Sequence, residues 1–119
     1  MIDDRELVAA QTGRNVRALE YEAQGCLEDA IALYEQNVAE GFTADLPYGR
    51  LVAIYTKRGQ PDEAVRVLER AVAVFEALPR RHPVRTPRLK VFRARLKEAR
   101  KALAPPKPRR RGAASDDAL

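Results

Sequence analysis

Two stretches of this chain repeat one pattern and decide its fold. Residues 21–31 read YEAQGCLEDAI, and residues 55–65 read YTKRGQPDEAV. When the two are aligned, tyrosine, glycine and alanine coincide, and the acidic pair of one stretch meets that of the other. The offset is 34 residues throughout, without a gap. A self-similarity of this period indicates an array of structural repeats.

Each unit of the repeat reads as a helix, a tight turn and a second helix. In the second unit Asp45 is a candidate N-cap, and Gly59 suits the left-handed residue that ends a helix. Pro61 fits the first turn of the next helix, where its missing N–H is not needed. The apolar residues around this turn recur at helical spacing, and they are Leu51, Val52, Ile54, Tyr55, Ala64, Val65, Leu68, Ala71, Val72, Phe75 and Leu78. The sequence therefore predicts an all-α fold built from helical hairpins.

The units resemble the tetratricopeptide repeat family. The second unit, over 45–78, meets the family pattern of aromatic, small and large apolar residues at Tyr48, Leu51, Val52, Tyr55, Gly59, Ala64, Leu68 and Ala71. The first unit, over 11–44, meets it at Ala18, Tyr21, Gly25, Ala30 and Tyr34. It departs from the pattern at Arg14, Arg17 and Asn37, which we interpret as an exposed edge that no preceding repeat covers. The resemblance implies an α–α superhelix of two repeats.

Two repeats need further apolar surface, because such arrays are normally stable from about three units upward. Residues 79–87 hold three prolines and predict a stiff connector. Thr86 is a candidate N-cap, with Pro87 at the first helical position. An apolar seam follows at spacings of three and four residues, formed by Leu89, Phe92, Leu96, Ala99 and Leu103. We expect a helix over 87–103 that caps the second repeat. The alternative is that its seam pairs with a second copy of the chain in a homodimer.

These signals together predict five helices and two regions. The helices are expected near 4–24, 27–40, 46–58, 61–78 and 87–103, with Asp3 and Glu6 forming a capping-box pattern ahead of the first. The helical domain is expected to span 1–104. Residues 105–119 begin with a proline- and arginine-rich run and are predicted to be a disordered basic tail.

The charge of the 119-residue chain is unevenly spread. Residues 1–78 carry 8 basic and 14 acidic side chains, whereas residues 79–112 carry 14 basic side chains and a single acid. Such blocks bear on partners rather than on fold. No run approaches the ~20 apolar residues of a membrane span, and the acidic N-terminus is unlike a signal peptide. With a lone cysteine that cannot form an internal disulfide, we expect a cytoplasmic protein.

Side chains of catalytic or metal-binding type are too few to build a reactive centre. His82 is the only histidine and lies in the connector, and Cys26 has neither a histidine nor a second cysteine beside it. The glycines are isolated, which argues against a phosphate-binding loop. The acidic pairs after each turn are explained by the positive end of a helix. The sequence predicts no enzyme, no cofactor and no metal.

The family resemblance implies where a partner would bind. The first helix of each repeat lines a concave groove in this family, and the two units would contribute Asn15, Leu19, Glu22, Gly49, Ala53 and Thr56. Some relatives grip a peptide carboxylate there with lysine and asparagine, but this chain does not carry that pair at the matching places. Gly49 is costly inside a helix. Close approach of a ligand backbone and a flexible first turn beside Pro47 both explain it.

Two hypotheses of function follow. The leading one is a non-catalytic protein–protein interaction module that binds a peptide or partner protein through the groove. The alternative is a nucleic-acid-associated protein that uses its basic helix and tail for non-specific phosphate contacts. The candidate anion-binding residues of the tail are Lys107, Arg109, Arg110 and Arg111. Only Phe92 is aromatic beyond residue 78, so base stacking is not expected.

Overall fold

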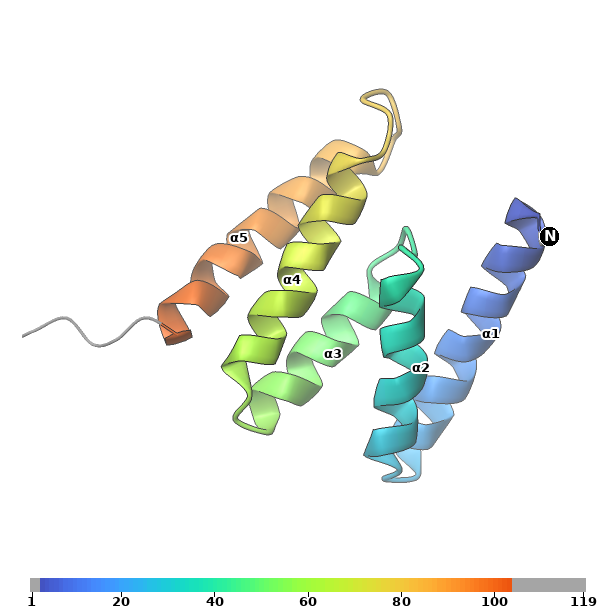
Figure 1. The fold of residues 1–119 in the computed structure, drawn as a ribbon, viewed down its shortest axis with the longest axis vertical. Coiled ribbons are helices and arrows are strands. Elements are labelled where there is room, and N and C mark those ends of the chain that lie inside the picture. Colours follow the sequence, from blue (N-terminus) through green and yellow to red (C-terminus); the bar gives the residue numbers. More distant parts are fainter. Residues whose placement is uncertain (1–2, 104–119) are drawn as a thin grey trace, which may run out of the picture.

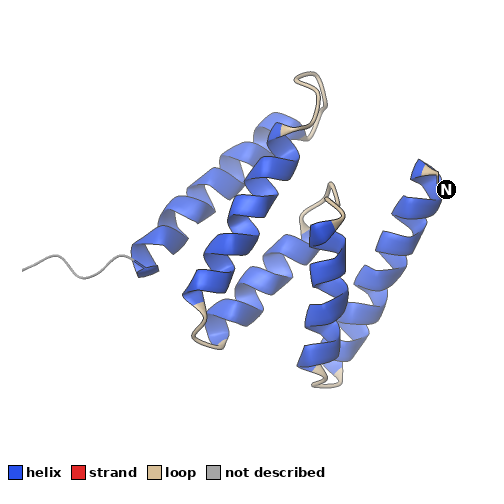
Figure 2. Ribbon diagram, in the orientation of Figure 1, coloured by secondary structure: helices blue, strands red, loops and turns tan. Residues whose placement is uncertain are grey.

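The computed structural model describes residues 3–103, which fold into five α-helices and contain no strand (Figures 1 and 2). The helices are α1 (Asp4–Ala23), α2 (Leu27–Ala39), α3 (Leu46–Lys57), α4 (Pro61–Glu76) and α5 (Arg85–Leu103). Each helix runs antiparallel to the next and packs against it, and α2 also contacts α4 (Figure 1). The predicted all-α architecture is confirmed, while the expected tail over 105–119 lies outside the described residues.

The turn inside each repeat is made by the glycine that the sequence indicated. Gly25 and Gly59 have φ values of 79° and 72°, a left-handed conformation that side chains disfavour. The residue after each glycine donates its N–H back to the helix, from Cys26 to the Tyr21 carbonyl and from Gln60 to the Tyr55 carbonyl, both at 2.8 Å. This is the Schellman arrangement, which satisfies carbonyls that the end of a helix leaves free. The same local chemistry therefore closes both hairpins.

Four of the five helices begin where the sequence predicts, but of the three predicted N-caps only one is confirmed. Asp3 and Glu6 form the predicted capping box, with the Glu6 N–H donating to the Asp3 carboxylate at 2.8 Å. Asp45 makes no side-chain cap on α3; instead its carboxylate accepts from Arg88 at 2.6 Å. Thr86 is not an N-cap, because α5 already begins at Arg85. Both corrections arise where α5 and its connector meet the start of α3, a contact that local sequence cannot show.

Helix α4 ends at Glu76, two residues before the expected end at Leu78. The Leu78 N–H bonds to the Phe75 carbonyl at 3.2 Å, which tightens the last turn. Because a residue that precedes a proline is disfavoured in the helical conformation, Pro79 explains the early stop.

Helix α5 caps the second repeat, as expected. Phe92 is fully buried, and its ring lies 5.7 Å from that of Tyr48 and 5.4 Å from that of Phe75. Leu89 and Leu96 are also buried, whereas Leu103 is 44% exposed, so the seam is shorter than predicted. The homodimer hypothesis would use this same seam, but most of it is already buried within the chain.

Ion pairs join the basic helix to the acidic body. Arg93 contacts Glu76 at 2.6 Å, and Arg100 contacts Glu69 at 3.0 Å, both across the interface of α5 and α4. All four side chains are about half exposed, so each pair contributes ~0–1 kcal/mol. Apolar burial therefore holds α5 in place, and the charges favour its orientation.

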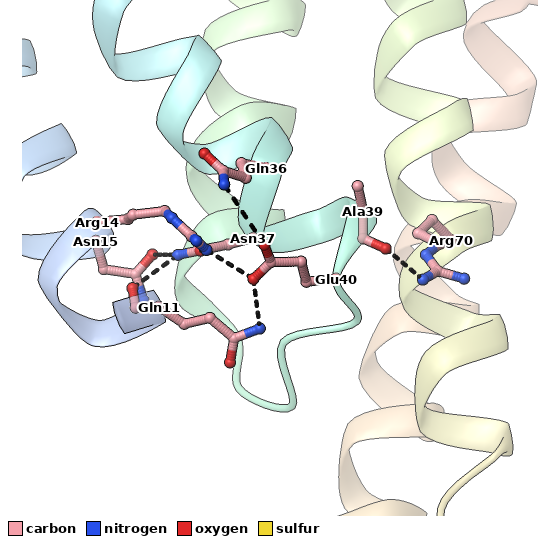
Figure 3. Close-up of polar contacts among 8 residues, drawn as sticks. All are labelled: Gln11, Arg14, Asn15, Gln36, Asn37, Ala39, Glu40 and Arg70. Carbon is pink, nitrogen blue, oxygen red and sulfur yellow. Dashed lines mark hydrogen bonds and ion pairs between the residues drawn. The ribbon is translucent and has the colours of Figure 1, made fainter. Parts of the chain in front are cut away.

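A polar network joins α1 to α2 (Figure 3). Asn37 is fully buried, and its amide donates to the Asn15 side chain and to the Gln11 carbonyl, each at 2.8 Å. Arg14 donates to the side-chain oxygen of Asn37 at 2.9 Å and to the carboxylate of Glu40 at 2.7 Å. Of the three departures from the family pattern, only Arg17 lies at an exposed edge. Asn37 and Arg14 instead hold the first hairpin together, because each finds a partner across the helix pair.

Candidate functional site

An apolar groove of about 690 Å³ lies between α3 and α5, with the first turns of α4 as its floor. Its α3 wall includes Gly49, Ala53 and Thr56, three of the six groove residues named from the sequence. The remaining lining residues are Val52, Pro61, Ala64, Leu68, Ala94, Arg95, Glu98, Ala99 and Ala102. Small side chains dominate the walls, so a bound segment could bring its backbone close.

The groove exists because α5 packs along α4 and has little contact with α3. The two helices approach each other at the Tyr48 and Phe92 rings, and also at Gly49, where an added Cβ would lie 3.7 Å from the Arg95 guanidinium. That spacing is an ordinary van der Waals contact, so glycine is not required there for space. Beneath the groove, Ala64 and Leu68 are buried and belong to the hydrophobic core.

The other three predicted groove residues lie elsewhere. Asn15 is buried in the interface of α1 and α2, where it accepts from Asn37. Leu19 is 41% exposed on α1. Glu22 is held by two neighbours, accepting from the Tyr34 hydroxyl at 2.6 Å and from Arg50 at 2.5 Å. The six residues therefore do not all line this groove, and the predicted tail residues lie outside the described range.

The first repeat shows why only the second unit lines this groove. At the 34-residue offset, Tyr34 corresponds to Leu68, and Glu22 corresponds to Thr56. In the first unit the buried Tyr34 ring and the Glu22–Arg50 ion pair bridge α1, α2 and α3. In the second unit Leu68 has no hydroxyl and Thr56 has no charge, so these two side chains cannot form the same bridge. The hydrogen bonds of Glu22 with Tyr34 and Arg50, which we call the polar tie, thus bind α1 to α2 and α3. The matching place between α3 and α5 has no such contact and stays open.

The electrostatics of this tie follow from its hydrogen bonds. Arg50 donates to Glu22 and is the main cause of a lowered pKa of that carboxyl, with the Tyr34 hydroxyl adding to the effect against the cost of burial. Burial raises the pKa of the Tyr34 hydroxyl, and its bond to Glu22 raises it further. The carboxylate therefore stays ionised and the phenol stays neutral near neutral pH.

Sequence reasoning missed the α5 wall of the groove. The sequence predicts α5 to be a cap, a dimer seam or a phosphate-contacting helix, but not a groove wall, yet Ala94, Ala99 and Ala102 supply half of the small lining residues. Three alanines among the cations of this helix were a usable signal, because a purely solvated basic face has no need of small residues. How α5 lies relative to α3 could not be predicted from the sequence.

Cationic side chains of α5 divide into paired and unpaired groups. Arg93 and Arg100 form ion pairs with acids of α4, and Arg88 forms one with Asp45, the residue before α3. Lys101 pairs with Glu98 on its own helix. Within residues 3–103, the side chains of Lys90, Arg95 and Lys97 make no ion pair or hydrogen bond. Of these three, only Arg95 lines the groove.

No reactive centre emerges in the part of the chain that the structure describes. Among residues 3–103, no group of three or more His, Cys, Asp and Glu side chains is placed to hold a metal ion. His82 accepts a weak hydrogen bond from the Val84 N–H at 3.4 Å within the connector, and the Cys26 thiol is half-buried. No helix in this range combines the length and apolar character needed to cross a membrane.

Two glycine-closed helical hairpins at a period of 34 residues, with an added capping helix, place the chain among the helical-repeat proteins. Residues 48–80 match the family model of the tetratricopeptide repeat, which covers the second predicted unit and its groove wall. The match identifies one tetratricopeptide repeat, over residues 48–80. No curated protein and no solved structure matches the chain.

Proposed function

We propose that this protein is a non-catalytic module that binds a short segment of a partner protein in the groove between α3 and α5. The observation that carries the proposal is the groove itself, which is apolar and walled mostly by small side chains. A segment that enters it would bury apolar surface, the dominant favourable term in such associations. The family match to residues 48–80 supports the same side of the molecule.

The nucleic-acid hypothesis has less support among the described residues. Arg88, Arg93 and Arg100 are engaged with acids of the same chain, which reduces the charge that α5 offers to phosphates. The remaining candidates lie in the tail. Non-specific phosphate binding would weaken steeply with added salt, since it depends on the release of counterions. Binding of the full chain to random-sequence RNA across a salt series tests this alternative.

The groove is tested by selection of short peptides of randomised sequence, displayed on phage, against the immobilised full chain. Ala53 is exposed on the α3 wall, so Ala53→Trp fills the groove without entering the core. Ala32 is exposed on α2 and does not line the groove, so Ala32→Trp is the matched control. We expect peptides that bind the wild-type protein and Ala32→Trp but not Ala53→Trp. Failure to select any peptide, or equal binding to all three proteins, would overturn the proposal.

A further inference from the structure

We infer that the segment that occupies the groove carries an acidic side chain, which pairs with Arg95. Short apolar side chains next to this acid face the alanine-lined walls. This inference rests on the proposed function and specifies the chemistry of the partner. It follows from three observations: an unpaired cation in an apolar groove, the pairing of neighbouring charges elsewhere, and the small size of the wall residues.

Arg95 is the uncompensated charge of the groove. Its guanidinium lies where α3 and α5 come together, 3.7 Å from the position of a Cβ on Gly49. Within residues 3–103 it makes no ion pair or hydrogen bond. Arg95 is exposed, so a carboxylate of a segment bound in the groove can reach its guanidinium beside the apolar walls. An ion pair of this kind contributes specificity as well as affinity.

The other charge of the groove does not neutralise Arg95. Glu98 lies on the same wall, but its carboxylate contacts Lys101 at 3.1 Å. Helix α5 keeps a net positive charge even after its ion pairs are discounted, because Lys90, Arg95 and Lys97 pair with no acid within residues 3–103. A basic segment would be repelled, and a neutral one would leave Arg95 partly desolvated without a partner.

The walls select the side chains next to that acid. Gly49, Ala53, Ala94 and Ala99 leave room for a backbone at close range, and Leu68 provides an apolar floor. Alanine, serine, valine or leucine in the partner would fit such a space better than a long charged side chain, because the latter would lose hydration without finding a partner. The preferred segment is therefore short-chained and apolar, with one acid.

Charge reversal separates this inference from the proposed function. Peptides are selected against the wild-type protein, Arg95→Glu and Lys97→Glu. Lys97 is an exposed, unpaired cation of the same helix that lies outside the groove, so its reversal gives the same change in net charge. We expect wild type and Lys97→Glu to enrich peptides with Asp or Glu, and Arg95→Glu to enrich peptides with Lys or Arg. Circular dichroism establishes that all three proteins remain helical.

Fluorescein-labelled synthetic copies of one selected peptide then give the magnitude. Replacing its acid by the amide should weaken binding to wild type by about two- to fivefold, and should leave binding to Arg95→Glu unchanged or improved. Equal peptide composition from wild type and Arg95→Glu, with binding still blocked by Ala53→Trp, would overturn this inference and leave the groove proposal standing. Peptides that bind Ala53→Trp as well as wild type would overturn the proposed function itself.

Discussion

The side-chain amide of Asn37 donates to the side-chain oxygen of Asn15 at 2.8 Å, inside the interface of α1 and α2. Asn37 is fully buried, and its second donor contact is the backbone carbonyl of Gln11. The second repeat has Ala71 at the matching place, 34 residues further on, so comparison of the two repeats alone would favour Asn37→Ala as a stabilising change. The network of Figure 3 argues the opposite, because the substitution leaves buried polar groups without partners.

Asn37→Ala should therefore lower the free energy of unfolding by about 1–3 kcal/mol, measured by urea denaturation. The double variant Asn15→Leu/Asn37→Ala is the control, since it removes both side-chain partners together. Its loss should be smaller than the sum of the two single losses. A more stable Asn37→Ala protein would show that the network does not stabilise the hairpin.

Two glycines should respond to alanine with opposite signs. Gly49 lies inside α3 with ordinary space beside it, so Gly49→Ala should raise stability by about 0.5–1 kcal/mol through the lower backbone entropy of the unfolded chain. Gly59 has a φ of 72°, so Gly59→Ala should destabilise by about 1–2 kcal/mol. Thermal unfolding of the two variants beside wild type measures both effects. Equal shifts would contradict the assignment of Gly59 to the turn and of Gly49 to the helix.

The capping role of α5 predicts a large effect at one aromatic residue. Phe92 is fully buried against Tyr48 and Phe75, so Phe92→Ala should cost about 3–5 kcal/mol. Leu103→Ala, at the exposed end of the same seam, should have little effect. Because the contacts are within one chain, both results should hold at every protein concentration. Stability that rises with concentration, with a dimer in sedimentation, would instead support the homodimer hypothesis.

Acid should weaken the tie between the first repeat and α3. The pKa of Glu22 is lower in the folded protein than its ordinary value, chiefly because Arg50 donates to it. Its ionised form therefore stabilises the fold above the ordinary glutamate pKa, and this contribution is lost as pH falls through the lowered folded-state value. Glu22→Gln should be less stable than wild type near pH 7, and the difference should shrink on acidification. Denaturant unfolding of both proteins from pH 7 into the acid range measures this difference in the free energy of unfolding.

A matched control for that experiment is Glu28→Gln. Glu28 pairs with Arg58, but its side chain is 77% exposed, so its loss should change stability little. If Glu22→Gln and wild type lost stability in parallel as the pH fell, Glu22 would not be the group responsible.

Local sequence was sufficient to predict the helices, the turns and much of the core. Gly25 and Gly59 end helices because left-handed backbone favours glycine wherever it occurs. The apolar spacing of α4 and α5 identified Phe75 and Phe92 as core residues, since helical periodicity fixes which side chains share a face. These features depend on neighbours within a few residues along the chain.

Most of the candidate site could not be found in this way, because only Gly49, Ala53 and Thr56 of its lining residues were predicted to line a groove. Glu22 was placed in a binding groove, yet it is tied to Tyr34 and Arg50, which come from two other helices. No local signal separates Arg95 from the other cations of α5, yet it lines the groove beside Gly49. Each of these roles depends on residues far away in the sequence, so no local pattern could assign them.

The sequence by itself determined the repeat, its period and the positions of its five helices, because hydrogen bonding, turn chemistry and helical periodicity act over short range. Only the tertiary structure decided which inter-helix space stays open. That outcome depends on how α5 packs on α4 and on whether a tyrosine and an ion pair bridge the neighbouring helices, as they do in the first repeat. Packing of this kind is a property of whole helices in contact, and it locates the groove where Arg95 meets Gly49.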